Sequence, residues 1–108
     1  MSWAMDELEA RANRQLDSLH DLNERYAAIV VRETSADDLV TVEVDGVGAL
    51  TGLWLASGAN ELGAARLGEQ IVATSALAAQ RAFAKRALIT EEFNESFAEL
   101  LGTRPVDG

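Results

Sequence analysis

The sequence predicts an α/β (α+β) fold in which two long helices flank a three-stranded antiparallel sheet, in the order α-β-β-β-α. Three observations lead to this prediction. Apolar residues recur at intervals of three and four along residues 5–29, which is the period of a helix. They alternate along residues 39–45, which is the period of a strand. A second helical pattern, rich in alanine, covers residues 61–89.

Residues 5–29 are predicted to form one amphipathic helix, because no glycine or proline interrupts them. The apolar positions follow a heptad seam whose one polar member is Gln15. The seam consists of Met5, Leu8, Ala12, Gln15, Leu19, Leu22, Tyr26 and Ile29. A seam of this length either packs on its own domain or also pairs with a second subunit, and the pattern alone leaves both open.

The sheet is predicted from short segments separated by turn residues. Residues 29–34 are rich in β-branched side chains, which favour strands. Residues 35–38 predict a turn, because serine and aspartate side chains bond to nearby backbone groups. Residues 39–45 predict a strand with one buried and one solvated face. The buried face is expected to carry Val40, Val42 and Val44.

A hairpin is predicted directly after this strand. Asp45 and Gly46 are typical of a tight turn, because such a turn needs a positive φ that glycine adopts without strain. Gly48 follows closely and indicates a slightly longer, bulged connection.

Residues 49–55 are the predicted return strand of this hairpin. Alternation places Leu53 and Leu55 inward with the valines and Trp54 outward. An outward tryptophan can stack on a base, anchor a partner or be covered by a second subunit. We expect burial at a subunit interface.

Residues 61–89 are predicted to form the second long helix, after an irregular first turn at Gly63. Thr90 is expected to cap a separate last helix, since two glutamates directly after it suit a positive helix N-terminus. Gly102 is expected to end that helix, and Pro105, the single proline, lies in the tail.

Composition excludes several classes of function. The chain has 108 residues, 9 of them basic and 18 acidic, for a net charge of −9. It has no cysteine and a single histidine, His20, which excludes thiolate sites and multi-histidine metal sites. The paired acids at 37–38 and 91–92 have no catalytic pattern, and the glycines form no phosphate loop. We expect no catalytic residue, no metal and no cofactor.

The expected protein is cytoplasmic and makes no membrane contact. No apolar run reaches the roughly 18 residues of a membrane span. Residues 1–9 are acidic and lack the apolar core of a secretory signal. We expect a single domain over residues 1–108, because this length fits one hydrophobic core.

Basic charge is concentrated in one segment. Residues 57–89 carry a net charge of +2, whereas the segments on either side are acidic. Arg81, Lys85 and Arg86 share one side of the predicted helix. Two interpretations remain open: these cations complement the dipole near a helix C-terminus, or they contact phosphates.

The strand VTVEVDG at 40–46, the return strand LWL at 53–55 and the alanine-rich helix together resemble the YbaB/EbfC family of small bacterial nucleoid-associated proteins. The stretch from Asp45 to Leu53 looks closest to the actinobacterial branch, which includes EspL-like proteins associated with type VII secretion. The resemblance covers about residues 5–90, with 91–108 as a C-terminal helical extension and tail. It implies a homodimer with projecting helices, DNA binding and no enzymatic activity.

Two functional hypotheses follow from this resemblance. The first is a nucleoid-associated homodimer that binds DNA weakly and without sequence preference. The second is an EspL-like adaptor or stabilising partner of a type VII secretion protein, with little or no DNA binding, which the net charge of −9 favours. The candidate DNA-binding residues are Arg81, Lys85, Arg86, Arg11, Arg14 and Arg25. The candidate dimer or partner interface residues are Leu19, Leu22, Tyr26 and Trp54.

Overall fold

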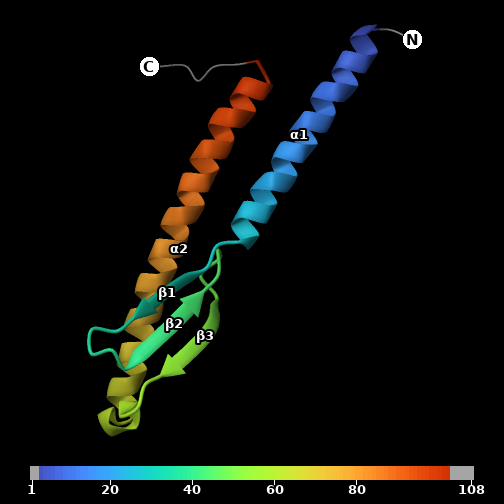
Figure 1. Ribbon diagram of the computed structural model, residues 1–108. Coiled ribbons are helices and arrows are strands. Elements are labelled where there is room, and N and C mark those ends of the chain that lie inside the picture. The colour runs from blue at the N-terminus through green and yellow to red at the C-terminus, as the bar shows by residue number, and fades with distance from the viewer. Residues whose placement is uncertain (1–2, 103–108) are drawn as a thin grey trace, which may run out of the picture. The chain divides into compact units, whose positions relative to one another are not determined.

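The computed structural model describes residues 3–102 and has the predicted order of elements (Figure 1). The elements are helix α1 (Trp3–Ala27), strands β1 (Val31–Thr34), β2 (Val40–Val44) and β3 (Leu50–Leu55), the short 3-10 helix η1 (Ala59–Leu62) and helix α2 (Ala64–Leu100). The α+β prediction is confirmed. Helix α1 ends at Ala27, so Ile29 is buried after the helix rather than on its seam. Pro105 lies outside the described residues.

The chain packs as two compact units. The first, which we call the sheet unit, is Ala27–Arg86. The second, which we call the arm unit, combines Met1–Tyr26 with Ala87–Gly108. Helix α2 contributes its first part to the sheet unit and its last part to the arm unit. The single domain expected over residues 1–108 stays a prediction.

The sheet is antiparallel in the order β1-β2-β3. Residues that pair directly across strands share a face, so the register puts the β2 valines and the β3 leucines on one side. The pairs are Val40 with Leu55, Val42 with Leu53, and Val44 with Leu50. Trp54 pairs with Thr41 and therefore lies on the opposite, outer face. The predicted faces of the hairpin are confirmed.

Helix α2 covers the valines of the sheet unit but leaves β3 open. The three β2 valines are at most 1% exposed, and Ala78 and Ala82 of α2 are fully buried. Leu53, on the same face, is 42% exposed, so the prediction that it lies in the core of the chain is wrong. The reason is its position on an edge strand. In Figure 1, α2 passes behind β1 and β2, whereas β3 lies to the side of the helix.

The β2–β3 turn depends on Gly48 rather than on Gly46. Gly48 has a φ of 80°, and it is the glycine of this turn whose φ is positive. Oδ1 of Asp45 holds the turn, because it accepts hydrogen bonds from the N–H groups of Val47 and Ala49 at 3.0 Å each. A Cβ on Gly48 would lie 2.9 Å from Cζ of Phe83. The positive φ is therefore the reason for glycine at this position, and a Cβ would also press on the exposed Phe83 ring.

Helix α2 continues through Thr90, so the predicted separate last helix is wrong. No glycine or proline occurs between Gly68 and Gly102, so nothing removes an i to i−4 backbone hydrogen bond. The Thr90 hydroxyl forms a hydrogen bond with the Tyr26 hydroxyl at 2.5 Å instead of capping a helix. Gly102, with a φ of 76°, follows the helix end as predicted. Gly63, with a φ of 82°, separates η1 from α2.

We predict that Val42→Ala lowers the free energy of unfolding by about 1–3 kcal/mol, through lost burial and an unfilled cavity. Urea unfolding measures the change. The control is Val47→Ala, because Val47 is an exposed turn valine and its truncation leaves no cavity. A loss below about 0.5 kcal/mol for Val42→Ala would show that the valine row is not the core.

Candidate nucleic-acid interface

The negative charge of the chain is concentrated in the arm unit. The sheet unit has five basic and seven acidic residues, a net charge of −2. The arm unit has four basic and eleven acidic residues, a net charge of −7. A polyanion such as DNA is repelled by like charge, and the repulsion acts over roughly the 8 Å Debye length of physiological salt. DNA contact is therefore least opposed on the sheet unit.

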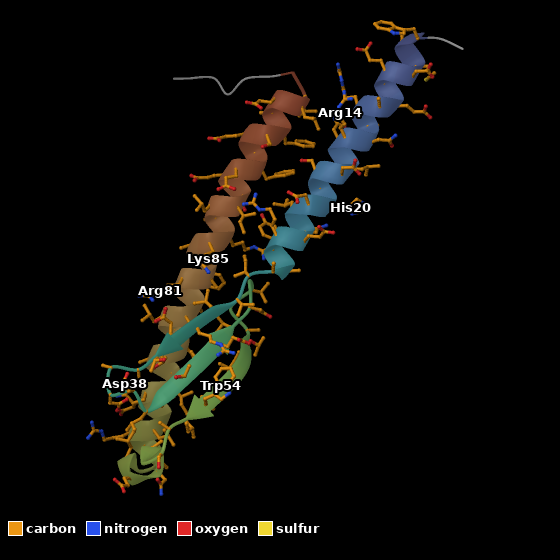
Figure 2. All side chains as sticks on the ribbon, viewed as in Figure 1. Arg14, His20, Asp38, Trp54, Arg81 and Lys85 are labelled. Carbon is orange, nitrogen blue, oxygen red and sulfur yellow. The ribbon has the colours of Figure 1, made fainter. Side chains whose placement is uncertain are left out.

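The predicted cations Arg81, Lys85 and Arg86 lie near one another in sequence on the part of α2 within the sheet unit, and we call them the basic turn. Figure 2 labels Arg81 and Lys85. Arg81 donates a hydrogen bond from Nη1 to Oε1 of Glu33 on β1, which ties this side of α2 to the sheet. Arg86 donates from Nη1 to the Gly46 carbonyl oxygen over 3.5 Å. Lys85 is exposed, with its ammonium available to solvent. Arg81 therefore reaches β1 whereas Arg86 reaches the β2–β3 turn, so these two side chains do not share one side of α2 as the sequence predicted.

The other three predicted cations belong to the arm unit. Arg25 donates from Nη2 to Oε2 of Glu92 at 2.5 Å, and this hydrogen bond raises the pKa of the Arg25 guanidinium. Arg11 and Arg14 are exposed one turn apart on α1, among acidic neighbours. The structure thus places these cations on a different unit from the basic turn, in the region of greatest negative charge.

The predicted interface residues of α1 differ in exposure. Tyr26 is half-buried and bonded through its hydroxyl to Thr90 of its own chain. Leu22 is half-buried, whereas Leu19 is 42% exposed. Of these seam residues, Leu19 therefore offers the most apolar surface to another molecule.

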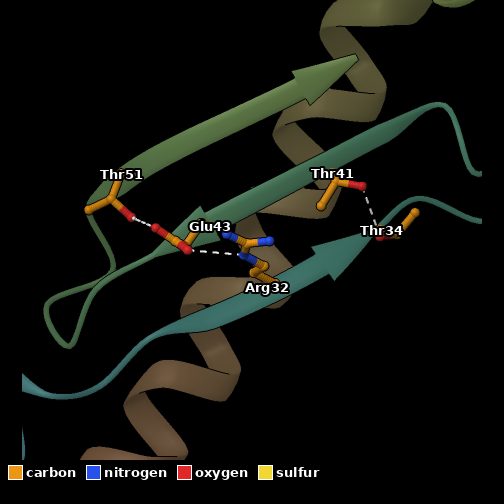
Figure 3. Close-up of polar contacts among 5 residues, drawn as sticks. All are labelled: Arg32, Thr34, Thr41, Glu43 and Thr51. Carbon is orange, nitrogen blue, oxygen red and sulfur yellow. Dashed lines mark hydrogen bonds and ion pairs between the residues drawn. The ribbon is translucent and has the colours of Figure 1, made fainter. Parts of the chain in front are cut away.

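The outer face of the sheet carries a polar network of Arg32, Glu43 and Thr51 that sequence reasoning missed (Figure 3). Arg32 of β1 donates from Nε to Oε1 of Glu43 at 3.0 Å, and the Thr51 hydroxyl donates to Oε2 of Glu43 at 2.9 Å. The Arg32 guanidinium carbon also lies 4.4 Å from the centroid of the Trp54 ring, a cation–π contact. Hydrogen bonds from Arg32, and then from Thr51, lower the pKa of Glu43.

The inner side of β3 and one side of α2 form an exposed apolar surface. Because Arg81 faces β1 and Phe83 approaches Gly48 of the β2–β3 turn, Phe83 lies on the side of α2 nearer β3. Val72 is three helical turns before Phe83, on the same side. We call this surface the open face, and it consists of Leu50, Leu53, Leu55, Val72 and Phe83. Each of these five residues is at least 42% exposed.

No group of three or more histidine, aspartate or glutamate side chains among residues 3–102 is arranged to hold a metal ion. No helix in the same range is long and apolar enough to cross a bilayer.

Comparison with known proteins identifies one family. The sequence model described as the YbaB/EbfC DNA-binding family matches residues 1–97, which include α1, the sheet and most of α2. A search of curated proteins finds no match.

The Glu43 network predicts a dependence of stability on pH. The folded pKa of Glu43 is lowered, so its stabilising effect is complete above the unfolded value of about 4.3. The effect is lost as the pH falls through the folded value. We expect Glu43→Gln to lower the urea midpoint at pH 7. Between pH 5 and pH 3, the midpoint of this variant should fall less than that of the unmodified protein. Glu61→Gln, on the exposed η1, is the control for loss of one carboxylate. An equal effect of both variants would contradict the prediction.

Proposed function

The chain belongs to the YbaB/EbfC DNA-binding family, and from this premise we propose that it is a non-enzymatic, nucleoid-associated homodimer that binds DNA weakly and without sequence preference. The family match over residues 1–97 is the observation that carries the proposal. The basic turn supplies cations of the kind that contact phosphates. A nucleoid-associated role would place the protein in the cytoplasm.

The proposed DNA contact is made by Lys85 together with Arg81 and Arg86. Lys85 is exposed, and the Arg81 side chain is 59% exposed although it pairs with Glu33. The Glu33 side chain is only 11% exposed, so the guanidinium is expected to keep this carboxylate as a partner and to reach a phosphate with its other N–H donors. Contacts to phosphates carry no base information, which accounts for the lack of sequence preference. Arg11, Arg14 and Arg25 are weaker candidates because they lie in the acidic arm unit.

The proposed dimer forms through β3 and the open face. Strand β3 is at the edge of the sheet and its sequence, LTGLWL, has no charge or proline to prevent pairing with another strand. A second copy placed along β3 would cover the open-face leucines on one side and Trp54 on the other. The α1 residues Leu19 and Leu22 remain predicted interface residues, although this arrangement does not require them.

A second candidate function is the adaptor role in type VII secretion, with little DNA binding. The observation that favours it is the net charge of −7 on the arm unit, which suits a protein partner better than a nucleic acid. The actinobacterial, EspL-like assignment is part of this second proposal.

We predict that fluorescein-labelled duplex DNA binds the protein at low salt and dissociates as salt rises. If all three cations of the basic turn contact phosphates, log K should fall against log salt with a slope of about 3 per subunit. Replacement of Arg81, Lys85 and Arg86 by alanine should remove binding in an anisotropy titration. The matched control replaces Arg11, Arg14 and Arg25 by alanine, which changes the net charge equally and should retain most of the affinity.

Three outcomes of this titration would count against the assignment. Binding that survives the basic-turn change but not the arm change would place the DNA on the arm unit. Strong preference for one duplex sequence would contradict phosphate-only contact. No binding of the unmodified protein at low salt would reject DNA binding and favour the adaptor role.

We predict a dimeric mass by light scattering at micromolar concentration. Leu53→Lys should give a folded monomer, because it puts a charge into the proposed interface without entering the core. Val47→Lys, at a more exposed turn position outside the open face, should stay dimeric. A monomeric unmodified protein would refute the dimer. Loss of the dimer on changing Leu19 and Leu22 to lysine, but not on Leu53→Lys, would instead locate the interface on α1.

A further inference from the structure

Helix α1 exposes apolar side chains along most of its length. None of its 25 residues is buried. Leu8, Ala12, Leu16 and Leu19 follow one another at i, i+4, i+8 and i+11, and Met5 extends the same row. We call these five residues the α1 stripe, and Leu8 and Leu16 are 61% and 54% exposed. Most helical stability in proteins comes from packing of an apolar face, so a helix left open in this way requires a partner.

The end of α2 in the arm unit does not cover this stripe. The residues of α1 that are half-buried form a neighbouring face: Gln15, Ser18, Leu22, Arg25 and Tyr26. On that face Arg25 bonds to Glu92 and Tyr26 bonds to Thr90, both from α2. The α1 stripe is turned away from these contacts by part of a helical turn and stays exposed.

The arm unit that carries the α1 stripe is rich in carboxylates. On α1, Glu9 borders the stripe, next to Leu16 in the helical projection. The part of α2 in the arm unit adds Glu91, Glu92, Glu95 and Glu99, and residues 87–102 include no lysine or arginine. With a net charge of −7 per arm unit, a second copy or a nucleic acid would bring like charge onto this surface. Charge complementarity therefore selects a cationic occupant.

We propose that the arm unit binds a basic amphipathic helix of a partner protein. The apolar face of that helix covers the α1 stripe, and its lysine or arginine side chains are attracted by Glu9 and by the net charge of −7 on the arm unit. The row from Leu8 to Leu19 spans three turns, about 17 Å at 1.5 Å per residue, so a partner helix of about 12 residues matches it. This surface is separate from the basic turn and the open face, and its role does not depend on DNA binding.

A labelled synthetic helix of about 18 residues tests the proposal by anisotropy, with leucine at i, i+3, i+4 and i+7 and lysine elsewhere. We expect saturable binding to the full chain. Two peptides of matched length should fail to bind: one with glutamate in place of lysine, and one with serine in place of leucine. The first tests the charge requirement and the second tests the apolar requirement.

Variants of the protein locate the binding surface. Changing Leu8, Leu16 and Leu19 to serine should weaken peptide binding at least about tenfold. Changing Val30 and Val47 to serine, which alters exposed valines of the sheet unit, should leave it unchanged. Circular dichroism checks that α1 remains helical. A second variant, with Asp6 changed to asparagine and Glu9 to glutamine, leaves the stripe intact and should weaken binding several-fold and flatten its salt dependence.

The proposal is overturned if the leucine-lysine peptide does not bind, or if it binds the stripe variant and the second variant as tightly as the unmodified chain. Equal binding of the serine peptide would show attraction by charge alone and would also overturn it. If the stripe variant loses dimeric mass in light scattering while it stays folded, the occupant of the stripe is a second copy. DNA titrations of the same variants should match the unmodified protein, so failure here is distinguishable from failure of the DNA-binding proposal.

Discussion

The contact on which the sheet unit depends is the packing of an alanine face of α2 over the valine row of β2. Ala78 and Ala82 are fully buried, and so are Val40 and Val42. Alanine has no atoms beyond Cβ, so the helix backbone can approach the sheet closely, and the β2 valines are the largest fully buried side chains between them. Gly48 satisfies the same constraint at the turn, since a Cβ there would collide with Phe83. The orientation of α2 is thereby set.

That orientation decides what each side of α2 can do. The side toward β1 carries Arg81, which reaches Glu33. The side toward β3 carries Phe83 and Val72, which remain exposed because a thin core of small residues cannot extend over a third strand. Arg86 reaches the Gly46 carbonyl in the turn that Phe83 approaches, so the cationic and apolar surfaces of this helix adjoin at that turn. The arm unit, with a net charge of −7, is opposite in charge to the basic turn.

Periodicity predicted the helices, the strands and their faces, because these depend on the order of polar and apolar residues. It did not predict which apolar residues another element would cover. The alternation of residues along β3 placed Leu53 on the correct face of the sheet. Its exposure, however, depends on strand order and on which strands α2 crosses. Thr90 has the residue type of a cap, yet no glycine or proline interrupts the helix there, and Tyr26 engages the hydroxyl. Arg32 could be linked to Trp54 only once the register of β1 was known.

Part of the candidate site was predictable because it depends on residues that are close together in the sequence. The spacing of Arg81, Lys85 and Arg86 places them close together on one helix, and this local feature was available from sequence. The pairing of Arg81 with Glu33, and of Arg25 with Glu92, joins residues 48 and 67 positions apart. Such partners follow from tertiary packing and carry no local signal.

The central claim is that DNA contacts the sheet unit at the basic turn and not the acidic arms. Amide chemical shifts of ¹⁵N-labelled protein, followed as a short duplex is added at low salt, test it most directly. The claim requires that the largest changes lie around Arg81, Lys85 and Arg86, while Arg11 and Arg14 on α1 stay unchanged. Changes centred on α1, with the basic turn unaffected, would contradict it.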